Sequence, residues 1–485
     1  MEYPLAHSHL LLKRLLALNK PKSLAPAFHY VYMLGEVSQC RHDTDRELPF
    51  RQEANFAWLS GCDVPGSALT IAYEHEGGEE VDPSKVQTRL WLPDIDDAEV
   101  MWCGLPPSPE DLAKDIKLTS IQRGWTAPAL YPPKPANTAP PTILHTLPNV
   151  RPPTSVIASI NGPSHTTDYL LKALHEARRN KSPREIELMK RASEVTAGAH
   201  RELMRLVGSG AIKDENAAEA EFVAYCRRNG AKYQAYMPIV AAGTSAGTLH
   251  YVDNDRPFPS QPPTLLLVDA GAEWRNYAAD VTRCIPIGNG GRFTRECRDI
   301  YETVLAMQEE AFKLIKPGTD WEAIQRLMHD VLARRLLRIG IFKAGPLGNA
   351  SEDEVVAKLI SEGLTSAFYP HGVGHLLGID VHDVGGLPQG KSTEPLLKYL
   401  RLRVPLEEGF VVTVEPGCYF NDHLFAPFKN SEFVDHAKLQ QYRYVGGVRI
   451  EDNLLVTKTG FENLTPSWLP KTVADIESVT TGQSA

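Results

Sequence analysis

One short segment constrains this chain more than any other. Residues 370–385, PHGVGHLLGIDVHDVG, hold three histidines, His371, His375 and His382, and two aspartates. An ordinary apolar core rarely contains three imidazole rings from so short a segment, so the segment predicts a functional site. Acidic residues that could join these rings occur upstream and downstream, at Asp269, Asp280, Glu415 and Glu451.

The two upstream aspartates favour a metal ion. Asp269 ends an apolar run in VDAG, and Asp280 follows eleven residues later in AADVTR. A tight turn at residues 274–276 would fold the two runs into a hairpin and bring the carboxylates together. Two carboxylates that approach closely repel each other unless a cation lies between them.

The histidine spacing has a competing interpretation. His371 and His375 stand at i and i+4, as in zincin metalloproteases, but that class needs a glutamate after the first histidine and a continuous helix. Gly372 and Gly374 disfavour a helix here. We expect these glycines to let the backbone approach a ligand closely, and we expect His382 to lie in a strand-like run, GIDVHDV.

The downstream glutamates also sit in apolar surroundings. Glu415 ends the run FVVTVE, where an unpaired buried charge is costly. In VRIED, Arg449 and Glu451 alternate with apolar residues and so share one strand face. Arg449 is expected either to pair with a carboxylate or to orient Glu451 beside a metal.

Counting charges points to a dinuclear site. Two divalent cations neutralise the four carboxylates, and His375 adds a neutral nitrogen ligand. A donor set made mostly of oxygen atoms suits Mn²⁺. Two-metal sites activate water and polarise a carbonyl group, so the predicted chemistry is metal-assisted hydrolysis.

Composition narrows the partners and the location. At 485 residues the chain is too long for one core, and its net charge of −9 argues against nucleic acid as a partner. No apolar stretch approaches the ~20 residues of a membrane span, and the leucines of residues 9–18, broken by Lys13 and Arg14, predict a short amphipathic helix instead of a signal peptide. Seven scattered cysteines without a CxxC motif predict reduced thiols and a cytoplasmic location.

Cap and strand signals predict two domains. Residues 1–181 are typical of mixed α/β structure, with strand-like runs at 27–35 and 68–73. Ser182, a proline at the next position and Glu185 form the signature of a helix start, so we place the boundary before it. The predicted parts are an N-terminal domain at 1–181, a catalytic domain at 182–470 and a tail at 471–485. Further helices are expected to open at Asn216, Thr294 and Thr319, and further strands at 265–268, 410–414 and 448–456.

The acidic and histidine motifs together resemble a known family. The five residues within VDAG, AADVTR, HGVGHLLGIDVHD, TVEPG and GGVRIED look like the ligand set of the M24 "pita-bread" metallopeptidases. Within that group, residues 180–460 resemble prolidase (Xaa-Pro dipeptidase) and its sister, aminopeptidase P, and residues 50–61 resemble their amino-terminal domain. The implied fold class is a two-domain α/β protein: a smaller N-terminal α/β domain and a C-terminal pita-bread (creatinase/aminopeptidase) domain with a curved antiparallel sheet and flanking helices.

The resemblance implies how the metals are held. Two divalent ions per subunit are expected, with Mn²⁺ as the expected metal. Asp269 would bind one ion, His375 and Glu415 the other, and Asp280 and Glu451 would bridge them. Glu415 would also shuttle a proton.

The resemblance also implies the substrate contacts. His250 and His382 match substrate-binding histidines, and His371 matches a histidine that stabilises the transition state or the leaving nitrogen. Arg401 matches an arginine that meets the substrate's carboxyl end, and Arg449 one that supports the bridging glutamate. A further match, to a tyrosine beside the ligands and the substrate, is Tyr236.

The expected activity is cleavage of the Xaa-Pro bond of short proline-containing peptides by a homodimer. Arg401 would suit a dipeptide's carboxylate and Gly374 looks prolidase-like, so the first prediction is a dipeptidase; the alternative is aminopeptidase P. Metal-free relatives, namely creatinase and the pita-bread domains of histone chaperones, lack the ligand set. Methionine aminopeptidase shares the ligands but normally lacks so long an N-terminal extension.

Overall fold

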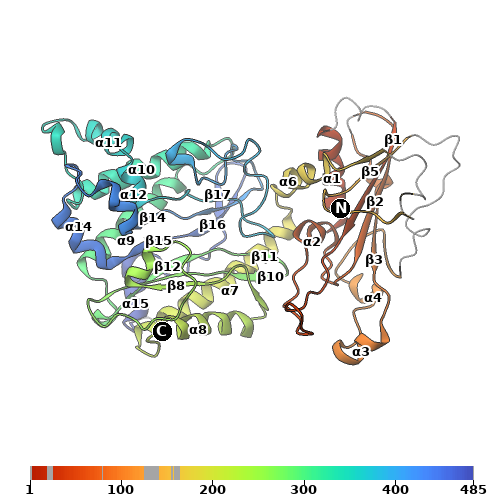
Figure 1. Ribbon diagram of the computed structural model, residues 1–485, viewed down its shortest axis with the longest axis horizontal. Helices are drawn as coiled ribbons and strands as arrows, with labels where there is room; N and C mark the ends of the chain where they lie inside the picture. Colours follow the sequence, from red (N-terminus) through yellow and green to blue (C-terminus); the bar gives the residue numbers. More distant parts are fainter. Residues whose placement is uncertain are drawn as a thin grey trace. The chain divides into compact units, whose positions relative to one another are not determined.

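The chain forms two compact units. The structure, a computed structural model, describes residues 3–18, 26–78, 80–124, 141–154, 157 and 164–483. Its units are Met1–Arg178 and Arg179–Ala485, so the division falls after residue 178, where the sequence placed it after residue 181. The elements of each unit are labelled in Figure 1.

The first unit is built on one mixed sheet. Its strand order is β4-β3-β2-β1-β5-β6, in which β1 runs antiparallel to β2 and parallel to β5. The strands are β1 (Ala27–Leu34), β2 (Ala68–His75), β3 (Gln87–Leu92), β4 (Ser120–Arg123), β5 (Thr142–His145) and β6 (Ser164–Thr166). The helices are α1 (Leu5–Leu18), α2 (Ala54–Ser60), α3 (Asp97–Cys103), α4 (Pro109–Leu112) and α6 (Leu170–Arg178).

Helix α1 has an apolar face that is buried within the first unit. Its leucines recur at helical spacing, and Leu11, Leu12 and Leu15 are fully buried. The helix packs against α6, whose Leu170 and Leu174 are also buried. The amphipathic helix predicted for residues 9–18 is therefore confirmed, and it begins earlier, at Leu5.

The second unit contains short antiparallel sheets. Their strand orders are β11-β10-β7, β12-β9-β8, β13-β16-β17 and β14-β15. The strands are β7 (Tyr233–Gln234), β8 (Ile239–Ala242), β9 (Thr264–Asp269), β10 (Ala272–Trp274), β11 (Tyr277–Ala278), β12 (Thr282–Ile287), β13 (Val411–Val414), β14 (Gly417–Tyr419), β15 (Gly447–Arg449), β16 (Asp452–Val456) and β17 (Phe461–Asn463).

Helices pack against these strands on more than one side. In Figure 1, α8 lies below and α10 above the strands β8, β12 and β15; α7 contacts β10, β11 and β12, and α9 contacts β14 and β15. The helices are α7 (Pro183–Gly208), α8 (Glu215–Arg228), α9 (Arg295–Phe312), α10 (Trp321–Arg338), α11 (Glu352–Ser361), α12 (Leu364–Phe368), α13 (Asp422–Phe425), α14 (His436–Tyr442) and α15 (Val473–Thr480).

Most predicted elements are present, with shifts at their ends. The capping box of Ser182 and Glu185 opens α7, and Thr294 caps α9, as predicted. Two other starts were wrong: Asp214 caps α8 and Asp320 caps α10, because their carboxylates accept from the backbone amides there. The strand expected at 448–456 is interrupted between β15 and β16, and the segment expected as a tail contains α15, which packs against α7.

Two further findings concern the whole described chain. All seven cysteines are free, as predicted. Across the described residues, no helix combines the length and the apolar character needed to cross a membrane.

Candidate metal centre

A β-hairpin positions the two aspartates. Strands β10 and β11 pair through Trp274 and Tyr277, and the turn residues Arg275 and Asn276 both have positive φ (48° and 70°), as a two-residue hairpin turn requires. The flanking strands β9 and β12 then pair antiparallel, with Asp269 opposite Thr282. The predicted hairpin is confirmed.

His375 enters the site from a non-helical segment. Its neighbour Leu376 bridges Val412 of β13, and its own carbonyl accepts from Thr413 N (2.9 Å). The ring's Nδ1 lies 3.0 Å from Leu376 O, so Nδ1–H donates there and Nε2 is left for the site. Nε2 lies 3.4 Å from Asp280 Oδ2 and 3.4 Å from Glu415 Oε1. A backbone carbonyl that fixes the tautomer in this way is typical of a metal-ligating histidine.

The two glutamates follow the ends of strands. Glu415 comes directly after β13, and its amide donates to Val373 O (2.8 Å). Glu451 lies between β15 and β16, where its amide donates to Thr282 O (3.1 Å) and its Oε2 accepts from Thr282 Oγ1 (2.8 Å). Its other oxygen, Oε1, is buried and has no hydrogen-bond partner among the described residues.

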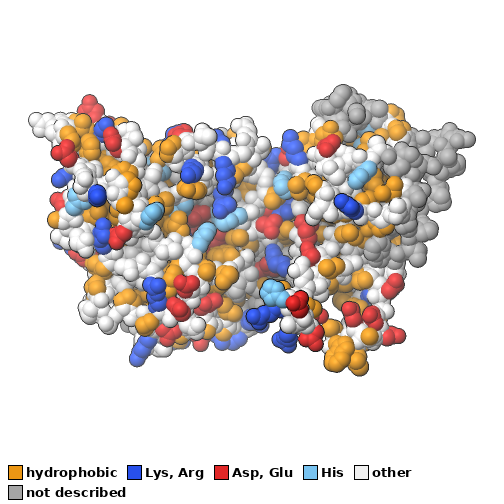
Figure 2. Space-filling view, viewed as in Figure 1, with side chains coloured by type: hydrophobic (Ala, Val, Ile, Leu, Met, Phe, Trp, Pro, Cys, Tyr) orange, Lys and Arg blue, Asp and Glu red, His pale blue; other side chains and the backbone are white. Residues whose placement is uncertain are grey.

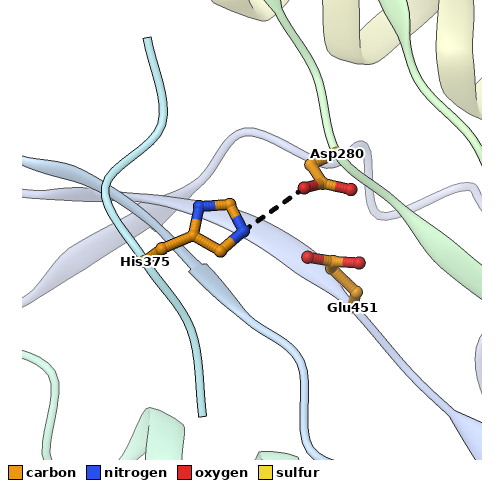
Figure 3. Close-up of side chains that lie close together, drawn as sticks. All are labelled: Asp280, His375 and Glu451. Atoms are coloured by element: carbon orange, nitrogen blue, oxygen red, sulfur yellow. Dashed lines mark ion pairs between the residues drawn. The ribbon is translucent and has the colours of Figure 1, made fainter. Parts of the chain in front are cut away.

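These groups converge on one point. Asp280, His375 and Glu451 each offer a ligand atom, and these atoms lie within 4.8 Å of one another (Figure 3). Asp269 and Glu415 join them in lining a cavity of about 780 Å³. The structure therefore brings all five predicted metal ligands into one neighbourhood.

Tyr236 lies between the two aspartates. Its hydroxyl oxygen is 2.5 Å from Asp269 Oδ1 and 2.5 Å from Asp280 Oδ1. Burial, followed by the charges of these carboxylates, raises the pKa of Tyr236 well above its usual value, so the hydroxyl keeps its proton. Tyr236 is thus in contact with two of the five ligands.

Arg449 pairs with a carboxylate, which is one of its two expected roles. Its Nη2 donates to Asp269 Oδ2 (2.5 Å), whereas the family resemblance implied support of Glu451. It reaches Glu451 only through Thr282, whose hydroxyl accepts from Arg449 Nε (3.2 Å) and donates to Glu451. In this arrangement both members of the buried Arg449–Asp269 ion pair have further hydrogen-bond partners.

His371 belongs to a hydrogen-bonded chain along the cavity wall. Its Nδ1 lies 2.9 Å from Gly372 O and its Nε2 lies 2.7 Å from Tyr419 Oη, which in turn accepts from Arg449 Nη1 (2.9 Å). Burial lowers the pKa of His371 to about 3, so the ring is neutral and Nε2 accepts the Tyr419 proton. Nδ1 also lies 3.6 Å from Glu415 Oε2.

The remaining predicted residues line the same cavity. They are His250, His382 and Arg401. The His382 ring stands edge-on to that of His375, with ring centres 4.5 Å apart. Burial lowers the pKa of His382 to about 3, with the charges of His375 and Arg401 acting in the same direction.

The electrostatics of the site fit a divalent cation. Burial, followed by the neighbouring carboxylates, raises the pKa of Glu451 well above its usual value. Burial also raises the pKa of Glu415, to about 7. Three buried carboxylates and the half-buried Glu415 repel each other beside one histidine, and the free Oε1 of Glu451 points to a missing partner. A metal ion would supply the positive charge and complete the coordination.

One local expectation was wrong and another stays a prediction. Gly372 and Gly374 line the cavity, where close approach to a ligand is still expected, and the Gly374 backbone also packs on a strand: a Cβ there would lie 2.0 Å from Thr413 O of β13. The run around His382 forms bends in place of a strand, because Asp383 Oδ2 is held by Lys181 Nζ (2.7 Å) and residue 378 hydrogen-bonds back to residue 380.

Sequence reasoning missed two contributing side chains. Thr282 stands two residues after Asp280 and so on the same strand face, a signal that could have found it. Tyr419 carries no comparable signal, since its contact with His371 depends on β14 pairing with β15.

Comparisons with known proteins agree with this geometry. Residues 187–458 match metallopeptidase family M24, and residues 11–125 match the aminopeptidase P N-terminal domain. Two curated relatives, probable Xaa-Pro aminopeptidases from Uncinocarpus reesii and Coccidioides posadasii, are 38% and 39% identical over 461 residues, which cover 93% of this chain and 89% and 92% of theirs.

Solved structures of the same kind share the fold. Zinc-substituted Escherichia coli aminopeptidase P in complex with product has a TM-score of 0.75 and 26% identity over 99% of both chains. Pseudomonas aeruginosa aminopeptidase PepP has a TM-score of 0.73 and 29% identity over 98% of both chains. The predicted fold class is confirmed, with a small N-terminal domain and a C-terminal pita-bread domain.

The same matches correct one prediction. They favour the second alternative of the sequence analysis, an Xaa-Pro aminopeptidase, over the dipeptidase that Arg401 and Gly374 suggested. Gly374 is explained by strand packing, so it carries no information on substrate length. The chain belongs to metallopeptidase family M24 and is a metal-dependent hydrolase.

Proposed function

We propose that this protein is an Xaa-Pro aminopeptidase, which releases the N-terminal residue of short peptides that have proline in the second position. The observation that supports it most is the convergence of four carboxylates and one imidazole in a single cavity. Relatives that match nearly the whole chain are Xaa-Pro aminopeptidases. Xaa-Pro dipeptidase is the second candidate, which Arg401 in the cavity wall favours.

The proposed metal content is two divalent ions, held as the family resemblance implies. Asp269 would bind one ion, His375 and Glu415 the other, and Asp280 and Glu451 would be shared. Ligands that are mostly carboxylate oxygens favour Mn²⁺. When bound, such a pair of ions activates water and polarises the scissile carbonyl.

The protein's own residues would bind substrate and handle protons. Glu415, beside the proposed metal ions, is the proposed group that accepts and returns a proton. His250 and His382 would bind the substrate near the scissile carbonyl and the proline. Arg449 would hold Asp269 in place through their ion pair. His371 is the proposed group that stabilises the transition state, held in orientation by Tyr419.

The chemistry of the bond explains why such a site is needed. An Xaa-Pro peptide bond has no N–H, so a protease that grips an extended backbone loses a hydrogen bond there. A site that holds the free amine and the carbonyl does not need that N–H. The cavity of about 780 Å³ has room for a short peptide.

The test compares two peptides on chelated protein before and after Mn²⁺ is restored. We expect no turnover after chelation, and after Mn²⁺ addition faster release of alanine from Ala-Pro-Ala than from Ala-Pro. Cleavage of Ala-Pro alone would establish the dipeptidase. Two results together would favour a metal-free relative such as creatinase: elemental analysis finds no metal in the purified protein, and the protein stays inactive when Mn²⁺ is added.

Three further expectations stay predictions. They are the homodimer, the cytoplasmic location and the absence of nucleic-acid and membrane partners. Sedimentation of the purified protein tests the first.

A further inference from the structure

One wall of the cavity is a single stretch of chain. Residues 387–401 contribute six of the lining side chains, and three of these are basic. The basic residues are Lys391, Lys398 and Arg401, all exposed. Figure 2 shows Lys, Arg and His side chains gathered on the visible face of the C-terminal unit.

The positive charge of this wall is not neutralised locally. The stretch has one acidic residue, Glu394. Its carboxylate is bound by Arg326, with Nη2 donating to Oε2 (2.7 Å). Within the described part of the chain, none of the three basic residues forms an ion pair.

The acidic residues of the cavity lie deeper than this wall, since three of the four are buried and Glu415 is half-buried. The carboxylates that line the cavity are the four predicted metal ligands and no others among the described residues. With two divalent ions bound, the four negative charges would be balanced. The net charge of the cavity would then be positive and would come from the basic wall. The protein as a whole carries −9, so this local positive charge is a contrast with the rest of the surface.

The wall is anchored, which keeps its charges near the cavity. Leu397 and Leu400 are buried in the core, at 1% exposure each. Just beyond the stretch, Arg403 N donates to Gly386 O (2.8 Å), so the two ends of the stretch are tied together. Binding a ligand through a basic side chain costs less conformational entropy when the loop that carries it is anchored than when the loop is mobile.

Burial sets the order of the groups: the carboxylates lie at the buried end of the cavity and the basic wall at its exposed end. His382 packs on His375. In the proposed function the free amine lies at the metal end. The part of a peptide that follows proline must then leave the cavity past the basic wall.

We propose that Lys391 and Lys398 select peptides that carry an acidic side chain beyond the proline. This rests on the proposed function. Exposed ion pairs are individually weak, about two- to fivefold in kcat/KM each, so the selection comes from the two charges acting together. It also weakens with salt, because the Debye length is only ~8 Å at physiological ionic strength.

The experiment measures kcat/KM on metal-loaded protein for peptides of equal size. Ala-Pro-Glu-amide against Ala-Pro-Gln-amide isolates a side-chain carboxylate. We expect the side-chain carboxylate to raise kcat/KM by about five- to tenfold at low salt, and the Glu-to-Gln ratio to approach one at high salt.

Variants assign the effect. Lys391→Gln/Lys398→Gln is expected to bring the Glu-to-Gln ratio close to one. The control, Lys316→Gln/Lys429→Gln, removes two exposed lysines outside the cavity and should keep the wild-type ratio. A wild-type ratio of one, or a ratio unchanged in the cavity double variant, overturns the proposal. Failure of the proposed function has a different result, in which no Xaa-Pro peptide is cleaved.

Discussion

The hydroxyl of Tyr236 contacts two carboxylates although it has a single proton to donate. One of the contacts with Asp269 and Asp280 is therefore satisfied only when a further positive charge enters the site. The same holds for Glu451, whose Oε1 is buried without a partner in the described part of the chain. At the scale of single residues, the site is incomplete as a set of protein groups alone.

Asp280 gives the sharpest test of this incompleteness. Asp280→Asn removes a charge and a ligand atom from the centre of the cluster without changing side-chain volume. We expect loss of turnover and of bound metal, with the circular dichroism spectrum largely intact. Asp253→Asn, an exposed carboxylate outside the cavity, should leave both readouts unchanged. Full activity of Asp280→Asn would remove this residue from the site.

Tyr419 tests a positioning role. Tyr419→Phe breaks the chain that joins Arg449 to His371 Nε2 and leaves the ring held only through Nδ1 and Gly372 O. Since residues that orient an active group typically change activity by about ten- to a hundredfold, kcat should fall to that extent while KM and metal content change little. Tyr301→Phe removes a buried hydroxyl that donates to Lys471 O, away from the cavity. Equal losses of kcat in both variants would contradict the role.

Among the secondary-structure elements, β13 and the segment before His375 are packed too closely for a side chain between them. The Thr413 carbonyl occupies the space that a Cβ on Gly374 would need, 2.0 Å away. The same strand supplies the hydrogen bonds that hold His375 N and O. Backbone contact, not ligand contact, thus fixes the depth of this histidine.

Gly374→Ala should therefore act on stability and on the site together. Pushing the segment off β13 is expected to lower the free energy of unfolding by about 1–3 kcal/mol and to weaken metal binding, because His375 moves with it. Urea unfolding and metal titration measure the two effects. Gly460→Ala, at a position with no atom within 4 Å of a new Cβ, is the matched control. Tight metal binding by Gly374→Ala would show that His375 is held independently of β13.

The elements also show what the sequence could and could not predict. The starts of α7 and α9 were predictable because Ser182 and Thr294 carry a local signature of the cap. The cap of α8 was misplaced because Asp214 and Asn216 compete within three residues. The Arg449–Asp269 pair joins residues 180 positions apart, and no local pattern encodes the register of the strands that bring them together. Motifs in the sequence predicted the five residues that converge in the cavity, whereas strand pairing determined which side chains lie next to them.

On the scale of the whole molecule, only the second unit buries carboxylates among the described residues, while both units bury histidines. The second unit buries carboxylates at the cavity as well as several histidines, whereas the core of the first unit buries a group of three neighbouring imidazoles. His29 Nδ1 lies 3.1 Å from His145 Nε2, and the His75 ring stands 6.1 Å from that of His29. Four ring nitrogens of these three residues have no partner among the described residues. Charging such rings in an apolar core is unfavourable, so the first unit should respond to acid.

Burial, followed by the other histidines, lowers the pKa of His29 to about 4 and that of His145 to about 3. The unfolded chain, with a histidine pKa near ~6.5, binds more protons than the folded one below that pH, so stability rises with pH. The contribution is fully present above pH ~6.5 and is lost as the pH falls towards 4. We expect amide exchange in β1 to accelerate as the pH falls through this window, because the free energy of opening decreases by up to roughly 3 kcal/mol for each ring.

Two variants test the role of the buried rings. His145→Gln should weaken the dependence of exchange on pH, whereas His42→Asn, at an exposed histidine with positive φ, should leave it unchanged. Exchange in β1 that is independent of pH, after correction for the intrinsic rate, would mean that the rings accept protons without opening the core.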